Sequence, residues 1–285
     1  MSKLIFVVPV RHPENVKQPE EQMRAFKDLF ASFCAQTDQN FRVKLVCNVE
    51  QVLPSLPSFV ERIDVSLPPN ASLYSSKSRQ EAFESIRTDK GMRVRAGLAS
   101  IAPDKDTLMV CDDDDLLHRK FVETVLSGDP SEIRFVEKGY RWISGTKELS
   151  ELHSFHKVCG TSLVIPARYY KIFRCSPDED EAVSELGSHI LPFKNMVQAG
   201  YPAKPFDFFA AAYRVNGSNS TQAAVAQAAQ RVSLLQKIRP RLRKIASAFI
   251  RPDQKPVKPV EAKTLSAGDW FRRDFLGGRS VEFDI

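Results

Sequence analysis

Four consecutive carboxylates, Asp112 to Asp115, follow an apolar stretch over 107–110 and a single cysteine. An apolar stretch of this length that ends at a polar break predicts a buried strand. Adjacent carboxylates repel one another and destabilise a fold unless a counter-ion neutralises them. Mg²⁺ and Mn²⁺ prefer oxygen ligands, so the run predicts a divalent metal, and phosphate as the group that the metal binds. The alternative is a helix cap before a helix over 119–126, for which one aspartate is enough.

Basic side chains accompany the aspartates. Lys90 and Arg95 precede them in a helical pattern over 79–101, and both are donors that suit a diphosphate. The loop Pro9-Val10-Arg11 ends the first apolar stretch of the chain. Ligands of parallel sheets bind beyond the carboxyl ends of the strands. We therefore expect this loop and the aspartate run to face one crevice.

The elements that must position these residues alternate in type. Strands are predicted over 4–10, 41–49, 63–65 and 107–111, and a helix begins at Pro19 with Met23, Phe26, Phe30 and Phe33 on one face. This order predicts an α/β fold, a Rossmann-like and mainly parallel sheet with helices on both faces. Later, short strands over 133–136, 140–143, 162–165 and 206–215 mix with a helix over 190–199 that Gly200 ends.

The C-terminal part has a different composition. Residues 231–251 contain seven Arg or Lys and no acid, while the whole chain carries a net charge of +6, so the rest is near neutral. This segment predicts a basic amphipathic helix on an anionic membrane surface, or else a helix packed on the body with a solvated basic side. We expect a domain over 1–220 with two halves, 1–118 and 119–220, a helical extension over 221–251, and a linker with an aromatic tail over 252–285.

Several classes of protein are excluded by the same composition. No stretch is apolar enough to cross a membrane, and the N-terminus lacks the features of a signal peptide. The five cysteines are odd in number and too far apart for a Cys-x-x-Cys pair, which predicts reduced cysteines and no zinc site. The near-neutral body argues against nucleic-acid binding. We expect a cytoplasmic protein that is peripheral at the inner face of the membrane.

Four segments, in this order, resemble a GT-A glycosyltransferase of the broad family-2 type, which includes bacterial enzymes of polysaccharide and glycoconjugate synthesis. They are Leu4-Ile5-Phe6-Val7-Val8-Pro9-Val10-Arg11, Lys90-Gly91-Met92-Arg93-Val94-Arg95-Ala96-Gly97, Met109-Val110-Cys111-Asp112-Asp113-Asp114-Asp115, and Gln198-Ala199-Gly200-Tyr201 with Tyr213-Arg214. The third segment contains the Asp-x-Asp motif of that family. The resemblance covers about residues 1–216, and it implies a nucleotide-sugar donor half over 1–118 and an acceptor half over 119–220.

The resemblance implies a hexosyltransferase-type enzyme that takes a nucleotide-diphosphate sugar as donor, a saccharide or glycolipid as acceptor, and Mn²⁺ or Mg²⁺ as cofactor. It implies that Asp114 binds the metal directly and that Asp112 contacts the ribose, or the metal through water. The donor site that it implies consists of Pro9, Arg11, Asn48, Lys90, Arg95, Asp112 and Asp113.

Two positions depart from the family pattern. Asn48 stands where the family has an acid that contacts the nucleoside. The family's catalytic base lies about eleven residues before the glycine that corresponds to Gly200, which is the position of His189 here. The base is then Asp180 across an insertion, or Glu185, or His189, which is also a candidate third metal ligand.

Two other functions remain open. A nucleotidyltransferase or Mg²⁺-dependent phosphohydrolase uses the same carboxylates, but nucleotidyltransferases of related architecture have a glycine-rich loop after the first strand, and residues 9–14 contain no glycine. The other is a non-catalytic membrane- or glycan-binding protein with a decayed transferase fold.

Overall fold

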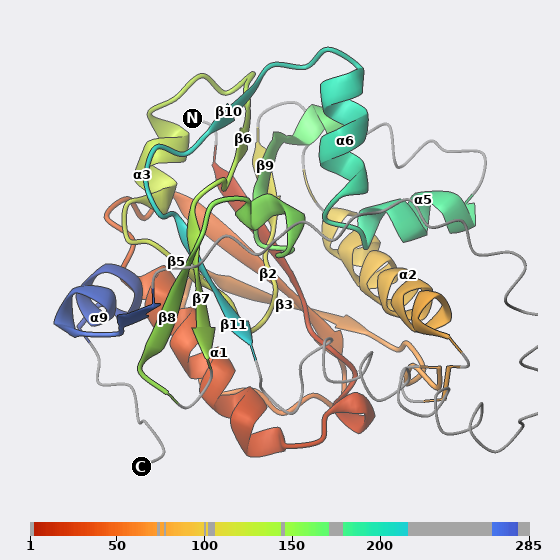
Figure 1. The fold of residues 1–285 in the computed structure, drawn as a ribbon. Helices are drawn as coiled ribbons and strands as arrows, with labels where there is room; N and C mark the ends of the chain where they lie inside the picture. Colours follow the sequence, from red (N-terminus) through yellow and green to blue (C-terminus); the bar gives the residue numbers. More distant parts are fainter. Residues whose placement is uncertain are drawn as a thin grey trace, which may run out of the picture.

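The computed structural model describes residues 3–72, 75–76, 78–99, 101, 106–143, 146–170, 179–215 and 264–278. These residues form two β-sheets with helices packed around the larger one (Figure 1). The larger sheet has seven strands in the order β10-β6-β9-β4-β1-β2-β3, and the smaller has five in the order β12-β8-β7-β11-β5.

The seven-stranded sheet is mainly parallel, as the sequence predicts. Its strands are β1 (Leu4–Pro9), β2 (Phe41–Asn48), β3 (Val60–Val65), β4 (Thr107–Val110), β6 (Ile133–Phe135), β9 (Leu163–Pro166) and β10 (Ala203–Pro205). Strands β1 to β4 run parallel to one another, and β10 is parallel to β6. Strand β9 runs antiparallel to both β4 and β6. Every residue of β1 is buried, as expected for a central strand covered on both faces.

Helices cover both faces of this sheet. Alternate residues of β1 point to opposite faces, so neighbouring residues belong to different cores. Phe6 belongs to a core with α1 (Pro19–Cys34) and α3 (Phe121–Leu126), and its ring lies 4.8 Å from that of Phe33. Val7 belongs to a core with α2 (Arg79–Leu98), α5 (Glu179–Leu186) and α6 (Leu191–Gln198). The predicted helix at Pro19 is confirmed, and α2 continues through Gly91 as one helix. Gly200, with φ +82°, follows α6 as predicted.

The five-stranded sheet contains β5 (Leu116–Leu117), β7 (Gly139–Ile143), β8 (Glu148–Leu152), β11 (Ala211–Val215) and β12 (Thr264–Ser266). One strand over 206–215 was expected, but the strand β11 begins only at Ala211. The reason is that residues 206–210 cross from β10 in one sheet to β11 in the other. On the way Phe206 stacks on Phe121 of α3, with 4.6 Å between the ring centroids.

The aromatic end of the chain returns to this smaller sheet. Strand β12 pairs antiparallel with β8, and α9 (Asp269–Leu276) buries Phe271 and Phe275 against it. The helical extension expected over 221–251, the linker over 252–260 and Phe283 lie outside the described residues. No helix in the described part of the chain has the length and hydrophobicity to cross a membrane.

Candidate functional site

The aspartate run lies where three parallel strands end. The Cys111 N–H donates to the Val7 carbonyl at 3.0 Å, and the Val10 N–H donates to the Val46 carbonyl at 2.9 Å, so the exits of β4, β1 and β2 are held side by side. Arg11 then lies in the charge environment of Asp113. The strand ends that carry the Pro9–Arg11 loop and the aspartate run are therefore adjacent, and that they face one crevice stays a prediction.

Asp115 points into the protein and is fully buried. Its carboxylate accepts hydrogen bonds from the Thr161 hydroxyl, from the Cys159 thiol at 3.0 Å and from the Arg214 backbone N–H at 3.3 Å. Burial, together with the charge of Asp112, raises the pKa of Asp115 to about 7. This carboxylate is an internal support for the run rather than a ligand for a molecule in the crevice.

Asp112 is part exposed and forms an ion pair with Lys90 of α2. Its backbone N–H donates to the Thr161 hydroxyl oxygen at 2.9 Å. Burial alone would lower the pKa of Lys90, but the attraction and hydrogen bond of Asp112 outweigh it, and the pKa is raised. Gly160 lies against this pair: a Cβ at that position would come within 2.5 Å of an Asp112 carboxylate oxygen and 2.6 Å of Lys90 Nζ. The pair therefore fills the space above Gly160.

Asp113 and Asp114 are also part exposed. Burial raises the pKa of Asp113, while the charge of Arg11 and a hydrogen bond from Gln22 act against the rise. Burial raises the pKa of Asp114 well above its usual value, and the charges of the other three aspartates add to this. Within the described part of the chain, no hydrogen bond or ion pair reaches the Asp114 carboxylate, although the charge of Arg214 acts against the rise in its pKa.

Two glycines bring α5 close to α2 beside this pair. A Cβ on Gly91 would lie 1.8 Å from the Val183 carbonyl oxygen, and a Cβ on Gly187 would lie 1.8 Å from the Arg87 carbonyl oxygen. Only residues without a side chain allow so close an approach of the two backbones. The chain that leaves α5 then carries His189 towards Lys90.

Among the base candidates whose side chains the structure describes, His189 is influenced by the charges of Lys90 and Asp112. Burial lowers its pKa, the charge of Lys90 lowers it further, and the charge of Asp112 acts in the opposite direction. Its Nε2 lies 3.4 Å from the Lys157 carbonyl oxygen. Glu185, the second candidate, accepts a hydrogen bond from the Asn195 amide of α6. Asp180, the third, is in the first turn of α5, and its side chain is outside the described residues.

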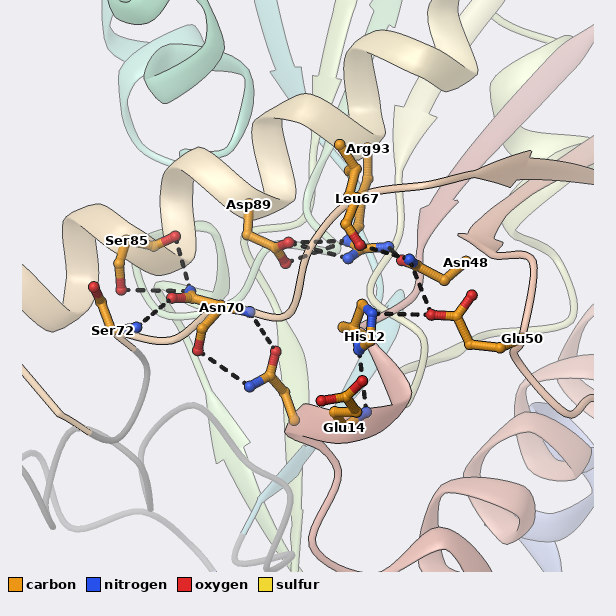
Figure 2. Close-up of polar contacts among 11 residues, drawn as sticks. His12, Glu14, Asn48, Glu50, Leu67, Asn70, Ser72, Ser85, Asp89 and Arg93 are labelled. Atoms are coloured by element: carbon orange, nitrogen blue, oxygen red, sulfur yellow. Dashed lines mark hydrogen bonds and ion pairs between the residues drawn. The ribbon is translucent and has the colours of Figure 1, made fainter.

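Asn48 bonds to neighbouring residues of the protein, and Figure 2 shows its contacts with Arg93 and Glu50. The side chain is 2% exposed. Its amide nitrogen donates to the Leu67 carbonyl at 2.7 Å, and its oxygen accepts from the Arg93 guanidinium at 2.8 Å. Arg93 is itself fully buried and pairs with Asp89 one turn earlier on α2. Asn48 thus ties the end of β2 to the segment after β3 and to α2.

The surface beside Asn48 carries a second pair. His12 Nε2 lies 3.0 Å from a carboxylate oxygen of Glu50, and the Asn48 amide reaches the same oxygen at 3.4 Å. His12 is 2% exposed, whereas about half of the Glu50 side chain faces solvent. Sequence reasoning named neither as a site residue, although Glu50 directly follows one predicted strand and His12 lies two residues beyond another.

The other two predicted donor residues are placed differently. Pro9 is buried at the end of β1, where it pairs with Val46 of β2. Arg95 is exposed on α2. It follows Lys90 by five residues, which is about 140° around a helix axis. The two side chains therefore leave α2 in different directions.

Three residues that hold the run in place were missed as site residues: Cys159, Thr161 and Arg214. Arg214 belongs to a segment that carries the family resemblance, and this was the available signal. Thr161 lies between a buried cysteine and a predicted strand, and nothing in its spacing marks it.

A divalent metal fits these carboxylates only in part. The Asp114 carboxylate, next to two part-exposed aspartates, supplies the oxygen donors that Mg²⁺ and Mn²⁺ require. However, no group of three or more His, Cys, Asp or Glu side chains among the described residues is arranged to hold a metal. The remaining ligands of an ion at this place must come from elsewhere, such as water or a bound phosphate.

Comparisons with known proteins give remote structural likenesses. No protein-family model matches the sequence, and no curated protein matches it either. One similar structure is the 2-C-methyl-D-erythritol 4-phosphate cytidylyltransferase of Francisella tularensis, with 9% identity and a TM-score of 0.39, covering 79% of this chain and 100% of that one. Another is the glycosyltransferase GlyE of Streptococcus pneumoniae, with 8% identity and a TM-score of 0.33, covering 84% and 63%.

A third similar structure is mouse xyloside xylosyltransferase 1, with 8% identity and a TM-score of 0.32, covering 85% of this chain and 83% of that one. All of these scores and identities are low. The fold class is therefore established by the sheet order and strand directions of the chain itself: a mixed α/β protein with a mainly parallel central sheet.

Proposed function

We propose that this protein is a metal-dependent glycosyltransferase of the GT-A type, which moves a sugar from a nucleoside-diphosphate donor to a saccharide or lipid-linked acceptor. The observation that carries the proposal is the aspartate run at the exits of β4 and β1. Among the described residues the Asp114 carboxylate has no hydrogen-bond or ion-pair partner, Lys90 pairs with Asp112, and the charge of Arg11 acts on Asp113. The carboxylates of this arrangement suit a metal cation, and its basic side chains suit a diphosphate.

The transferred sugar leaves a nucleoside diphosphate that gathers negative charge as the bond breaks. When bound, Mn²⁺ or Mg²⁺ supplies Lewis-acid stabilisation of that charge. Asp114, with Asp112 or Asp113, would hold the ion. Lys90 and Arg11 would donate hydrogen bonds to phosphate oxygens, and such charge-assisted bonds are stronger than neutral ones.

The acceptor hydroxyl is a weak nucleophile and needs a base within hydrogen-bond distance. Among the three candidates we favour His189, because it shares the charge environment of Lys90 and Asp112. Glu185 is engaged with Asn195 between α5 and α6. The variant H189Q should then slow transfer while donor binding is kept, and H189Q with unchanged turnover would return the role to Asp180 or Glu185.

The decisive experiment is a turnover assay with a panel of nucleoside-diphosphate sugars, with Mn²⁺ and with EDTA. We expect donor hydrolysis or transfer that requires the metal and that falls at least about 100-fold in Asp114→Ala, since a preorganised electrostatic contact is worth about this much. The control is Asp207→Ala, which removes an exposed carboxylate elsewhere on the surface. Unchanged activity in Asp114→Ala would refute the proposal.

The same assay separates the alternatives. Release of pyrophosphate from a nucleoside triphosphate would indicate a nucleotidyltransferase, and phosphate release from simple phosphate esters would indicate a phosphohydrolase. A protein that turns over nothing but binds glycans or liposomes would be a non-catalytic relative. The proposed contact of residues 231–251 with the membrane, at the cytoplasmic face, is tested by liposome binding of the full chain and of a chain without residues 231–285.

A further inference from the structure

We propose that Lys90 is an exchangeable counter-ion: it neutralises Asp112 in the ligand-free protein and passes to the diphosphate when a divalent metal takes its place on the carboxylates. Metal and diphosphate would then bind interdependently. This inference rests on the proposed function, because it concerns the same crevice, but it makes a separate claim about the order of binding.

The geometry that supports the proposal is the Lys90–Asp112 ion pair. The two side chains are 19% and 29% exposed, so the pair stands at the boundary between the interior and the crevice. Its floor is Gly160, above which no room for a side chain remains. Lys90 projects from the rigid helix α2 on a flexible stem, whereas Asp112 is fixed through its backbone N–H to Thr161. Lys90 is therefore the partner that can move.

The number of protein ligands gives the second argument. No three described His, Cys, Asp or Glu side chains form a metal site, and one of the available carboxylates is already engaged by an ammonium group. Mg²⁺ in such sites is usually bound by one or two carboxylates together with substrate phosphates. A metal without a diphosphate has too few ligands here and must also displace Lys90.

Displacement of Lys90 has a cost only while the ammonium lacks a new partner. A part-buried ammonium without a counter-charge is unfavourable. A diphosphate supplies that counter-charge and also completes the metal's coordination. Each ligand thus removes the main obstacle to the other, and the resulting coupling is reciprocal by linkage.

The test uses Mn²⁺ alone, pyrophosphate alone and the two together, with affinities measured by calorimetry and by the spin-resonance signal of free Mn²⁺. In the wild type, we expect weak binding of Mn²⁺ alone and at least about tenfold tighter binding with pyrophosphate. In Lys90→Met, which keeps most of the unbranched stem and removes the charge, Mn²⁺ alone should bind about threefold to tenfold tighter, because its competitor is gone. Pyrophosphate should then tighten Mn²⁺ binding much less.

Two variants keep the result interpretable. Lys90→Arg retains the positive charge and should restore the wild-type pattern, with thermal melts to confirm that each variant folds. Lys194→Met removes a lysine from the exposed face of α6 and should change nothing beyond the loss of one charge. If pyrophosphate enhances Mn²⁺ binding equally in the wild type and in Lys90→Met, the exchange is refuted while the proposed function stands. If neither ligand binds any of these proteins, both are refuted.

Discussion

The backbone N–H of Arg214 donates to the Asp115 carboxylate at 3.3 Å, although 99 residues separate the two in the sequence. The pairing of β11 with β5 makes this contact possible. The Arg214 guanidinium also donates to the Asp114 carbonyl at 3.2 Å, lies 4.4 Å from the Trp142 ring centroid and forms an ion pair with Asp28 of α1. Arg214 therefore joins the aspartate run to the second sheet and to α1.

The Arg214–Asp28 pair should contribute to stability as a unit. The side chains are 7% and 22% exposed, so the loss of one partner leaves a poorly solvated charge. We expect Arg214→Met and Asp28→Asn each to lower the free energy of unfolding by about 1–3 kcal/mol, with a coupling energy of about 1–2 kcal/mol in the double variant. Urea unfolding of the four proteins measures this cycle.

A surface pair provides the control for that cycle. Asp269 and Arg272 lie 3.8 Å apart, and the Asp269 side chain is fully exposed. Their double variant should show additive effects, because solvent screens such a pair. Additive effects for Arg214 and Asp28 as well would show that the buried contact does not hold the two elements together.

Asp115 and Asp114 should respond to substitution in opposite ways. Asp115→Ala leaves the donors of Thr161, Cys159 and Arg214 without an acceptor in the interior, so unfolding should become easier by about 2–4 kcal/mol. Asp114→Ala removes a poorly compensated charge and should leave stability unchanged or raised while it abolishes metal-dependent transfer. Thermal melts and turnover of both variants test this, and equal melting shifts would contradict the division of roles.

The sequence was sufficient for features that depend on local pattern. The apolar run of β1, the phenylalanine face of α1 and the polar break after β4 each predicted an element that the structure contains. Because the ends of parallel strands meet at one edge, the adjacency of the ends of β1 and β4, and with it the effect of the Arg11 charge on Asp113, also followed. In these cases the spacing of apolar residues, together with the common edge at which parallel strands end, allows few other structures.

The features that the sequence did not predict depend on contacts between distant segments. The interior role of Asp115 depends on hydrogen bonds from Thr161, which lies just before β9, and from Arg214 in β11. The side-chain bonds of Asn48 depend on Arg93 and on the segment after β3. Four identical residues in a row give no internal signal of which one turns inward; the partners decide it.

The C-terminal helix α9 should be an integral part of the folded body. Phe271 is fully buried, and its ring lies 4.8 Å from that of Phe275 and 5.8 Å from that of Trp142. Phe271→Ala should therefore lower the free energy of unfolding by about 3–5 kcal/mol. The control is Asp269→Ala on the exposed face of the same helix. An unchanged urea midpoint in Phe271→Ala would indicate that α9 does not remain docked in solution.

Protonation of His156 should lower the free energy of unfolding as the pH falls. Its ring lies 5.0 Å from that of Phe135 and 5.1 Å from that of Phe193, and its buried Nδ1 has no hydrogen-bond partner among the described residues. Burial lowers the pKa of His156 from 6.5, the charge of Lys157 lowers it further, and the Val136 backbone and Glu137 act in the opposite direction.

Because the folded state disfavours the charged imidazole, the unfolded chain binds more protons between the two pKa values. The contribution of neutral His156 to the free energy of unfolding is therefore complete above about pH 6.5. It is lost as the pH falls towards the lower, folded-state pKa. Urea unfolding between about pH 5 and pH 7.5 should show a shallower pH dependence in His156→Phe than in the wild type. His153→Gln, at a site whose side chain is 61% exposed, should keep the wild-type slope. Equal slopes in the wild type and in His156→Phe would show that this imidazole protonates as readily in the folded protein as in the unfolded chain.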